Sequence, residues 1–148
     1  MNIIKFNLVL ALSFTLGACG QVDMVDVSKD SKYKLAIGKQ YRTKSDLLAI
    51  GVTADINYKK KVDYIVLVSE PGFSGPEVIF RDYFSKGKII KVVKVLKSSS
   101  IFVSRVIYVV KVVGKNKYAG TEIRVKMIGE INDSNYGLGS LVYEKVNG

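Results

Sequence analysis

Short apolar segments rich in β-branched and aromatic residues, each closed by a cluster of turn-forming residues, constrain this chain most. Valine, isoleucine, tyrosine and threonine favour strands, while Gly, Pro, Asn and Ser favour turns. The expected strands are Gly38–Lys44, Leu47–Thr53, Val62–Glu70, Val78–Tyr83, Ile89–Lys97, Phe102–Val113, Thr121–Ile128 and Leu141–Lys145. The sequence therefore predicts an all-β fold, built as a small antiparallel barrel or sandwich.

In two of these segments, the pattern of apolar residues also predicts which faces of the strand are buried. The stretch Thr121–Ile128 alternates strictly, which is typical of a half-buried antiparallel strand. One face would carry Thr121, Ile123, Val125 and Met127, and the other would carry Glu122, Arg124 and Lys126. The stretch Phe102–Val113 is apolar at both odd and even positions, which predicts a long central strand covered on both faces.

Lysines recur at every third position from Lys88 to Lys97. On a helix this spacing would give an amphipathic surface able to lie on a membrane. On a flat strand the lysines would fall on both faces, whereas a β-bulge would bring them back to one side. The intervening isoleucines and valines favour the strand.

Residues 78–128 resemble bacterial Src-homology-3-like domains. The resemblance lies in the turn Lys86-Gly87-Lys88, the following Ile-Ile-Lys-Val-Val-Lys-Val strand and the aromatic-led strand Tyr108–Val112. The tryptophan common in that family is absent from this chain, so the family's ligand-binding groove is not transferred to it.

The first 18 residues have the layout of a secretory signal. Met1 and Lys5 form a positive start, Phe6–Leu16 is an apolar run, and the small residues Gly17 and Ala18 follow. The apolar run is shorter than the ~20 residues that a membrane-spanning helix needs. We therefore expect a signal helix that is removed after Ala18.

The motif Leu16-Gly17-Ala18-Cys19 resembles the lipobox of bacterial lipoproteins. The resemblance implies cleavage between Ala18 and Cys19, and attachment of diacylglycerol and a further acyl chain, such as palmitate, to Cys19. Gly20 in place of aspartate implies, in a Gram-negative cell, the periplasmic face of the outer membrane. The alternatives are an ordinary signal peptide with a chance cysteine and an uncleaved membrane helix.

We expect residues 19–32 to be a lipid-anchored tether and residues 33–148 to be a single β domain. The full chain has a net charge of +10, and without residues 1–18 it keeps 22 Lys and Arg against 13 Asp and Glu, a net charge of +9. Cys19 is the only cysteine, so no disulfide is expected. The expected location disfavours nucleic acid as a partner.

Histidine is absent, which excludes Ser-His-Asp catalysis and histidine metal ligands. The loop Gly72-Phe73-Ser74-Gly75-Pro76 lacks the second glycine of a nucleophile elbow, so a turn is favoured, although a Ser–Lys pair stays formally open. The stretch Asn132–Gly137 lacks the ligand spacing of a calcium loop. We expect no enzyme activity, metal or cofactor.

The lysines are the remaining signal, and they fit solubility and an anionic partner equally well. The candidate contacts with an anionic partner are Lys59, Lys60, Lys61, Lys88, Lys91, Lys94 and Lys97. The first functional hypothesis is a non-catalytic binding module, such as an immunity or inhibitor protein against an envelope-acting toxin or enzyme. Its charge favours an acidic target over a basic lysozyme. The alternative is a structural or assembly lipoprotein that binds peptidoglycan, lipopolysaccharide or another envelope component.

Overall fold

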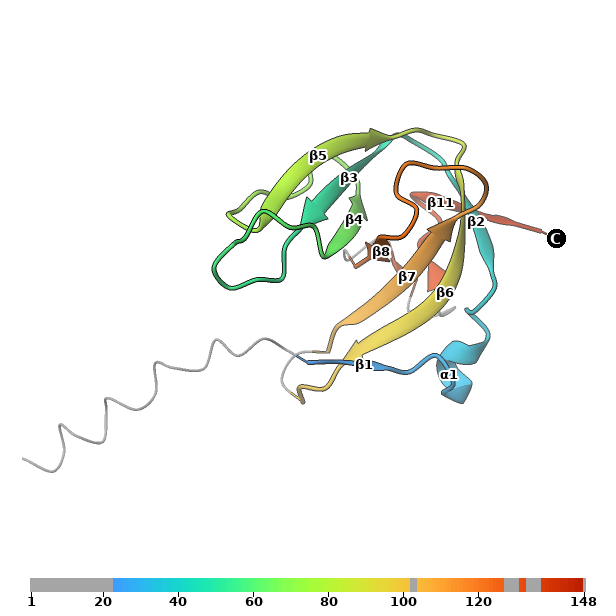
Figure 1. Ribbon diagram of the computed structural model, residues 1–148. Coiled ribbons are helices and arrows are strands. Elements are labelled where there is room, and N and C mark those ends of the chain that lie inside the picture. Colours follow the sequence, from blue (N-terminus) through green and yellow to red (C-terminus); the bar gives the residue numbers. More distant parts are fainter. Residues whose placement is uncertain (1–22, 102–103, 127–130, 133–136, 148) are drawn as a thin grey trace, which may run out of the picture.

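The computed structural model describes residues 23–101, 104–126, 131–132 and 137–147. Over these ranges the chain forms eleven strands and one helical turn (Figure 1). The elements are β1 (Met24–Asp26), α1 (Ser31–Lys34), β2 (Gln40–Thr43), β3 (Leu47–Val52), β4 (Tyr64–Val68), β5 (Val78–Phe84), β6 (Ile89–Ser98), β7 (Val106–Val112), β8 (Glu122–Val125), β9 (Ile131–Asn132), β10 (Gly137–Leu138) and β11 (Tyr143–Val146). The all-β prediction is confirmed, and each predicted strand overlaps an observed one.

One mixed sheet holds nine of these strands in the order β11-β2-β6-β7-β8-β4-β3-β5, with β1 beside β6. The strands β9 and β10 form a separate antiparallel pair. Neighbours in the large sheet are antiparallel except β4 and β8, which run parallel. The prediction of an antiparallel sheet was therefore wrong at this one pair. Because β5, β6 and β7 lie between β4 and β8 in the chain, no hairpin sets the relative direction of these two strands.

Two short connections force this sheet to coil. Residues 44–46 join β2 to β3, and residues 85–88 join β5 to β6, yet each pair lies five places apart in the sheet. Five strand spacings of ~4.8 Å would separate them by about 24 Å in a flat sheet. The connections extend to roughly 14 and 18 Å at ~3.6 Å per residue, so the two ends of the sheet must curl toward each other. Figure 1 shows this curvature.

The two connections also bond to each other. The buried Thr43 hydroxyl donates to the Ser85 carbonyl at 3.2 Å, and the Gly87 amide donates to the Thr43 carbonyl at 2.9 Å. The Lys86 amide donates to a carboxylate oxygen of Asp46 at 2.7 Å. These hydrogen bonds join the two connections at the point where both turn.

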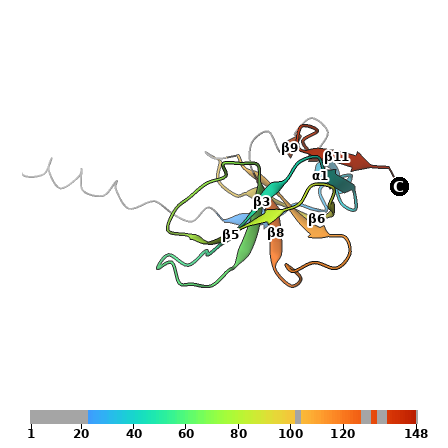
Figure 2. The ribbon, with the colours of Figure 1, turned by 90° about the horizontal axis from the view of Figure 1, so that it is seen from above.

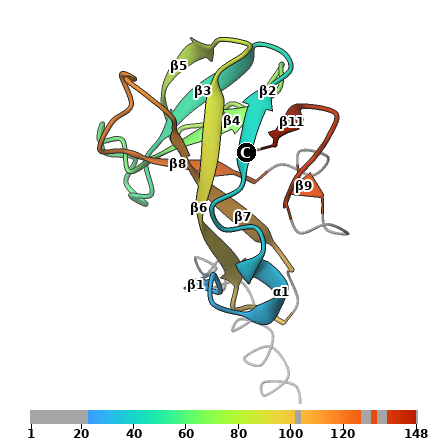
Figure 3. The ribbon, with the colours of Figure 1, turned by 90° about the vertical axis from the view of Figure 1, so that its right-hand side faces the viewer.

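The long strand β6 has β2 and β1 one after the other along a single edge (Figure 3). Gln40 pairs with Lys91 near the start of β6, and Met24 pairs with Ser98 at its end. The predicted tether over residues 19–32 therefore needs correction from Met24 onward, because this part of the chain completes the edge of β6. Sequence patterning missed it because β1 has only three residues and presents one of them, Met24, to an apolar cluster.

A β-bulge interrupts the pairing of β6 with β7 between Val92 and Lys94, and the strand prediction for this segment is confirmed. The bulge places Val92 and Val95 in the same core although they are three residues apart. Lys91 and Lys94 consequently share the opposite face. Lys97 does not join them, since it pairs with Val106, which packs against the main core.

The main core lies inside the coiled sheet and takes side chains from nearly every strand. It includes five buried tyrosines, of which Tyr108 and Tyr143 are the largest fully buried side chains. The other three are Tyr41 of β2, Tyr33 of α1 and Tyr118 of the β7–β8 connection. With no disulfide available, this apolar core supplies the main stabilisation of the fold.

Two smaller apolar clusters lie on the outer side of the sheet. Leu96, Ile107 and Val109 are covered by Met24 of β1, which explains why β7 is apolar at both parities. The second outer cluster consists of Leu48, Ile50, Val52, Val66 and Val68. Phe73 packs against it from the β4–β5 connection, so β3 and β4 are buried on both faces.

Gly72 lets this connection approach the sheet, and its replacement tests the cover. Its φ is +69°, and an added Cβ would lie 2.9 Å from Cδ1 of Ile50. We predict that Gly72→Ala lowers the free energy of unfolding by about 2–3 kcal/mol, from left-handed strain plus steric overlap. Gly87→Ala is the matched control, because Gly87 also has a positive φ of +82° but its added Cβ would meet nothing within 4 Å.

Urea denaturation of both variants measures the difference. Equal destabilisation of Gly72→Ala and Gly87→Ala would contradict the role of Gly72 in packing.

Candidate functional site

The outer face of β6, β7 and β8 carries a row of cations between the two outer apolar clusters. Alternation along each strand puts them there, because Tyr108, Val110, Ile123 and Val125 point into the main core. The members of this basic face are Lys91, Lys94, Lys111, Arg124 and Lys126. Lys91 and Lys111 lie directly opposite each other on neighbouring strands, an arrangement that destabilises an antiparallel pair.

Glu122 is the acidic residue that β8 contributes to this face, and two cations share it. The Nε atom of Arg124 contacts one carboxylate oxygen of Glu122 at 2.6 Å. The Nζ atom of Lys94 lies 3.7 Å from the other oxygen. Positive charge therefore exceeds negative charge on the basic face.

A cavity of about 520 Å³ opens at the end of the basic face where β7 begins. Five elements contribute to it: the start of β1, the β3–β4 connection, Tyr64 of β4, the start of β7, and β8 with Lys126. The lining residues are Asp23, Met24, Thr53, Ala54, Asp55, Ile56, Tyr58, Tyr64, Arg105, Ile107, Arg124 and Lys126. We call this cavity the basic pocket because three cations line it.

Aromatic rings support two of the three cations. The guanidinium carbon of Arg124 lies 3.9 Å from the centre of the Tyr64 ring. The Nζ atom of Lys126 lies 5.5 Å from the same ring centre and 5.4 Å from that of Phe73. These cation–π contacts hold the two side chains against aromatic rings of β4 and the β4–β5 connection.

The ammonium group of Lys126 is poorly compensated. Burial lowers its pKa below 10.5, and repulsion by Arg105 and then Arg124 lowers it further, while Glu77 acts in the opposite direction. A lysine in this position is stabilised by any anion that enters the pocket, since an anion favours the charged form.

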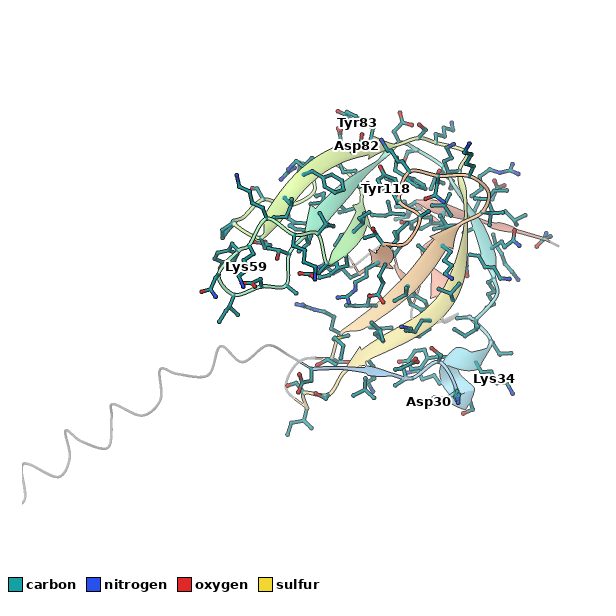
Figure 4. The ribbon with its side chains drawn as sticks, in the orientation of Figure 1. Asp30, Lys34, Lys59, Asp82, Tyr83 and Tyr118 are labelled. Atoms are coloured by element: carbon teal, nitrogen blue, oxygen red, sulfur yellow. The ribbon has the colours of Figure 1, made fainter. Side chains whose placement is uncertain are left out.

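The predicted contact lysines are only partly brought together. Lys91 and Lys94 lie on the basic face, and Lys97 lies across the sheet from them. Lys59, Lys60 and Lys61 belong to the β3–β4 connection, whose residues 53–56 and 58 line the basic pocket. Lys59 pairs with Asp55 at 3.7 Å and extends away from the sheet (Figure 4).

The remaining predicted contact, Lys88, lies in the β5–β6 connection, away from the pocket lining. The predicted set omitted Lys111, Arg105, Arg124 and Lys126. The strict alternation of β8 was the available signal for the last two, since it placed them on the polar face of that strand.

A second hollow of about 370 Å³ lies against β5 and is lined by Leu48, Glu70, Pro71, Arg81, Asp82 and Tyr83. Asp82 bonds outside it, accepting a hydrogen bond from the Tyr118 hydroxyl at 3.1 Å and pairing with Lys117 (Figure 4). The Lys117 hydrogen bond is the main cause that lowers the pKa of Asp82. This contact ties β5 to the β7–β8 connection, which is a structural role.

The other sequence candidates give no second site. Cys19 and Ala18, and residues 133–136 of the loop compared with calcium sites, lie outside the described residues. Ser74 is exposed in the β4–β5 connection, and no hydrogen bond joins it to a described lysine. Among the described residues, no group of three or more acidic, Cys or His side chains is placed to hold a metal ion.

Within the same ranges, the structure contains no helix of the length and apolar character needed to cross a bilayer. Comparison of the chain with protein-family models, with curated proteins and with solved structures gave no match. The arrangement of the chain's own residues must therefore carry any functional proposal.

The repulsion inside the basic pocket can be measured directly. We predict that Arg105→Gln raises the pKa of Lys126 toward 10.5, because it removes the strongest repelling charge while burial persists. Lys111→Gln also removes one positive charge from the basic face. It should leave the pKa of Lys126 unchanged, because Lys111 is not among the groups that shift this pKa.

NMR titration of the Lys126 ε-methylene group measures this pKa in each variant. An unchanged pKa in Arg105→Gln, or an equal rise in Lys111→Gln, would contradict the arrangement of charges described above.

Proposed function

We propose that this protein is a lipoprotein anchored through Cys19 to the periplasmic face of the outer membrane, where it acts as a non-catalytic binding module. Its basic face captures an acidic protein partner, as an immunity or inhibitor protein against an envelope-acting toxin or enzyme would. The observation that carries the proposal is the concentration of cations on one outer face, with Lys91 and Lys111 directly opposed.

Solubility alone does not require this arrangement. Charges that only solubilise a protein can be spaced apart, whereas a directly opposed lysine pair destabilises the sheet. An acidic partner offsets that repulsion on binding, and the local field increases the rate of encounter. A partner that is itself strongly basic would be repelled.

The coiled sheet suits such a role. We propose that it serves as a small barrel or sandwich of Src-homology-3-like character, with β5 to β8 as the matching region. The bonded corner formed by residues 43–46 and 85–88 supports this proposal, because it links β2 and β6 to β3 and β5, which lie five places away in the sheet. A rigid strand surface positions charged side chains more accurately than a loop does.

A structural or assembly lipoprotein is the second candidate, and the basic pocket favours it. A pocket of about 520 Å³ has room for a small anionic group of an envelope component such as lipopolysaccharide or peptidoglycan. Retention of the purified protein on either material, with no protein partner recovered, would favour this candidate over the first.

The anchor is tested by Cys19→Ala in growing cells. We predict that wild-type protein fractionates with the outer membrane and carries acyl chains by mass spectrometry, because two or more buried chains hold a protein firmly in a bilayer. The variant should lose the acyl mass and leave that fraction. Acyl chains on the variant, or their absence from the wild type, would contradict the anchor.

The basic face is tested by reversing one charge. Lys91→Glu places opposite charges at the Lys91–Lys111 position, so we expect a stability gain of roughly 0.2–1 kcal/mol. Binding of the acidic partner should nevertheless weaken about ten-fold or more, because a steering charge is reversed. Lys145→Glu on β11 is the control, since it gives the same net charge on an exposed position elsewhere.

Affinity purification from envelopes, followed by titration with the recovered partner, measures both effects. Equal binding by the two variants would show that the basic face does not contact the partner.

A further inference from the structure

The basic pocket lies beside the point where the described chain begins, and this position suggests its ligand. We propose that the pocket binds the phosphate of an anionic phospholipid headgroup in the membrane leaflet that holds the Cys19 lipid. The inference rests on the proposed anchor, and it adds a specific lipid contact that would orient the domain on the membrane.

The positive charge in the basic pocket is poorly compensated. Among the described residues, no carboxylate oxygen lies within 4.0 Å of the charged nitrogens of Arg105 or Lys126, whereas Arg124 is paired with Glu122. Arg105 and Arg124 both depress the pKa of Lys126, so the three cations act on one another. Arginine and lysine on neighbouring elements are typical ligands of a phosphate group.

Part of the lining of the basic pocket is apolar. Met24, Ile56 and Ile107 lie on the pocket wall together with the ring of Tyr64. Ile56 is 75% exposed and Tyr58 is 50% exposed, although both are large apolar side chains. A ligand with a charged head and an apolar body matches this combination better than an inorganic ion does.

Only a short stretch of chain separates the basic pocket from Cys19. Asp23 lines the pocket and is four residues beyond Cys19. A fully extended chain of that length spans at most about 14 Å, at ~3.6 Å per residue. The pocket is therefore held close to the headgroup layer in the anchored protein. Figure 1 and Figure 2 both place the β3–β4 connection, with its three lysines, at the end of the molecule where β1 begins.

Two carboxylates also line the pocket. Removal of a negative charge there should change phosphate binding in the opposite direction from removal of a positive charge. Asp55 is already engaged, accepting from the Asn57 amide at 2.8 Å and pairing with Lys59. Asp23 opposes an incoming phosphate. Removing its charge should strengthen binding, while removing the Arg105 charge should weaken it.

The test uses the full chain with Cys19→Ala in a nonionic detergent. This variant cannot be acylated at Cys19, so no attached lipid competes with the added lipid for the basic pocket. Dihexanoyl phosphatidylglycerol is titrated in, and the NMR shift of the Lys126 side chain reports occupancy. We expect Arg105→Gln to bind about five-fold more weakly and Asp23→Asn about five-fold more tightly. Lys145→Gln, which removes the same charge on β11, should bind as the parent chain does.

Three further ligands separate the possible sources of negative charge. Dihexanoyl phosphatidylcholine should bind more weakly than dihexanoyl phosphatidylglycerol, and inorganic phosphate should bind more weakly than both lipids. Equal binding of inorganic phosphate would overturn the lipid assignment. Tighter, Arg105-dependent binding of an oligoglutamate peptide would overturn it in favour of an acidic protein.

Equal loss of lipid binding in Arg105→Gln and Lys145→Gln would show a general charge effect and would also overturn the proposal. The result is independent of the anchor, because the tested chain cannot be acylated at Cys19. The proposed lipid anchor is tested separately by mass spectrometry, and wild-type protein without acyl chains would contradict it.

Discussion

The coil of the sheet depends on two connections that are too short to cross it. Residues 44–46 and 85–88 each join strands five places apart, and their mutual hydrogen bonds fix the corner where they meet. The inside of the coil becomes a single apolar core that includes five tyrosines. A chain without disulfides is stabilised mainly by such burial, so the fold depends on this constraint.

The outer side of the same sheet is divided into three parts. Strand β1 covers the apolar cluster on β6 and β7, and the β4–β5 connection covers the cluster on β3 and β4. The basic face is the uncovered strip between them, where lysines and Arg124 replace apolar residues.

The sequence predicted the strands well because their residues alternate or are continuously apolar. For β6 it predicted a strand and left a bulge as one way to bring the lysines to one side; the structure has a bulge between Val92 and Lys94. It missed the β1 pairing and the parallel β4–β8 pair, because both depend on contacts between distant segments.

The candidate site was predictable only in part. Counting lysines along the chain selected Lys91 and Lys94 correctly for one face but added Lys97, which the bulge and the Val106 pairing place across the sheet. Arg105 enters the pocket from outside any regular strand, so no periodicity identified it. Arg105 meets Arg124 and Lys126 because β7 and β8 pair antiparallel, which brings the start of β7 beside the end of β8.

The central claim is that the basic face contacts an acidic envelope protein. Photo-crosslinking in living cells from a reactive amino acid at position 111, compared with position 145 on β11, tests it most directly. The account predicts one dominant adduct from position 111, with an acidic protein identified by mass spectrometry, and no such adduct from position 145. The same adducts from both positions, or no protein adduct from position 111, would contradict it.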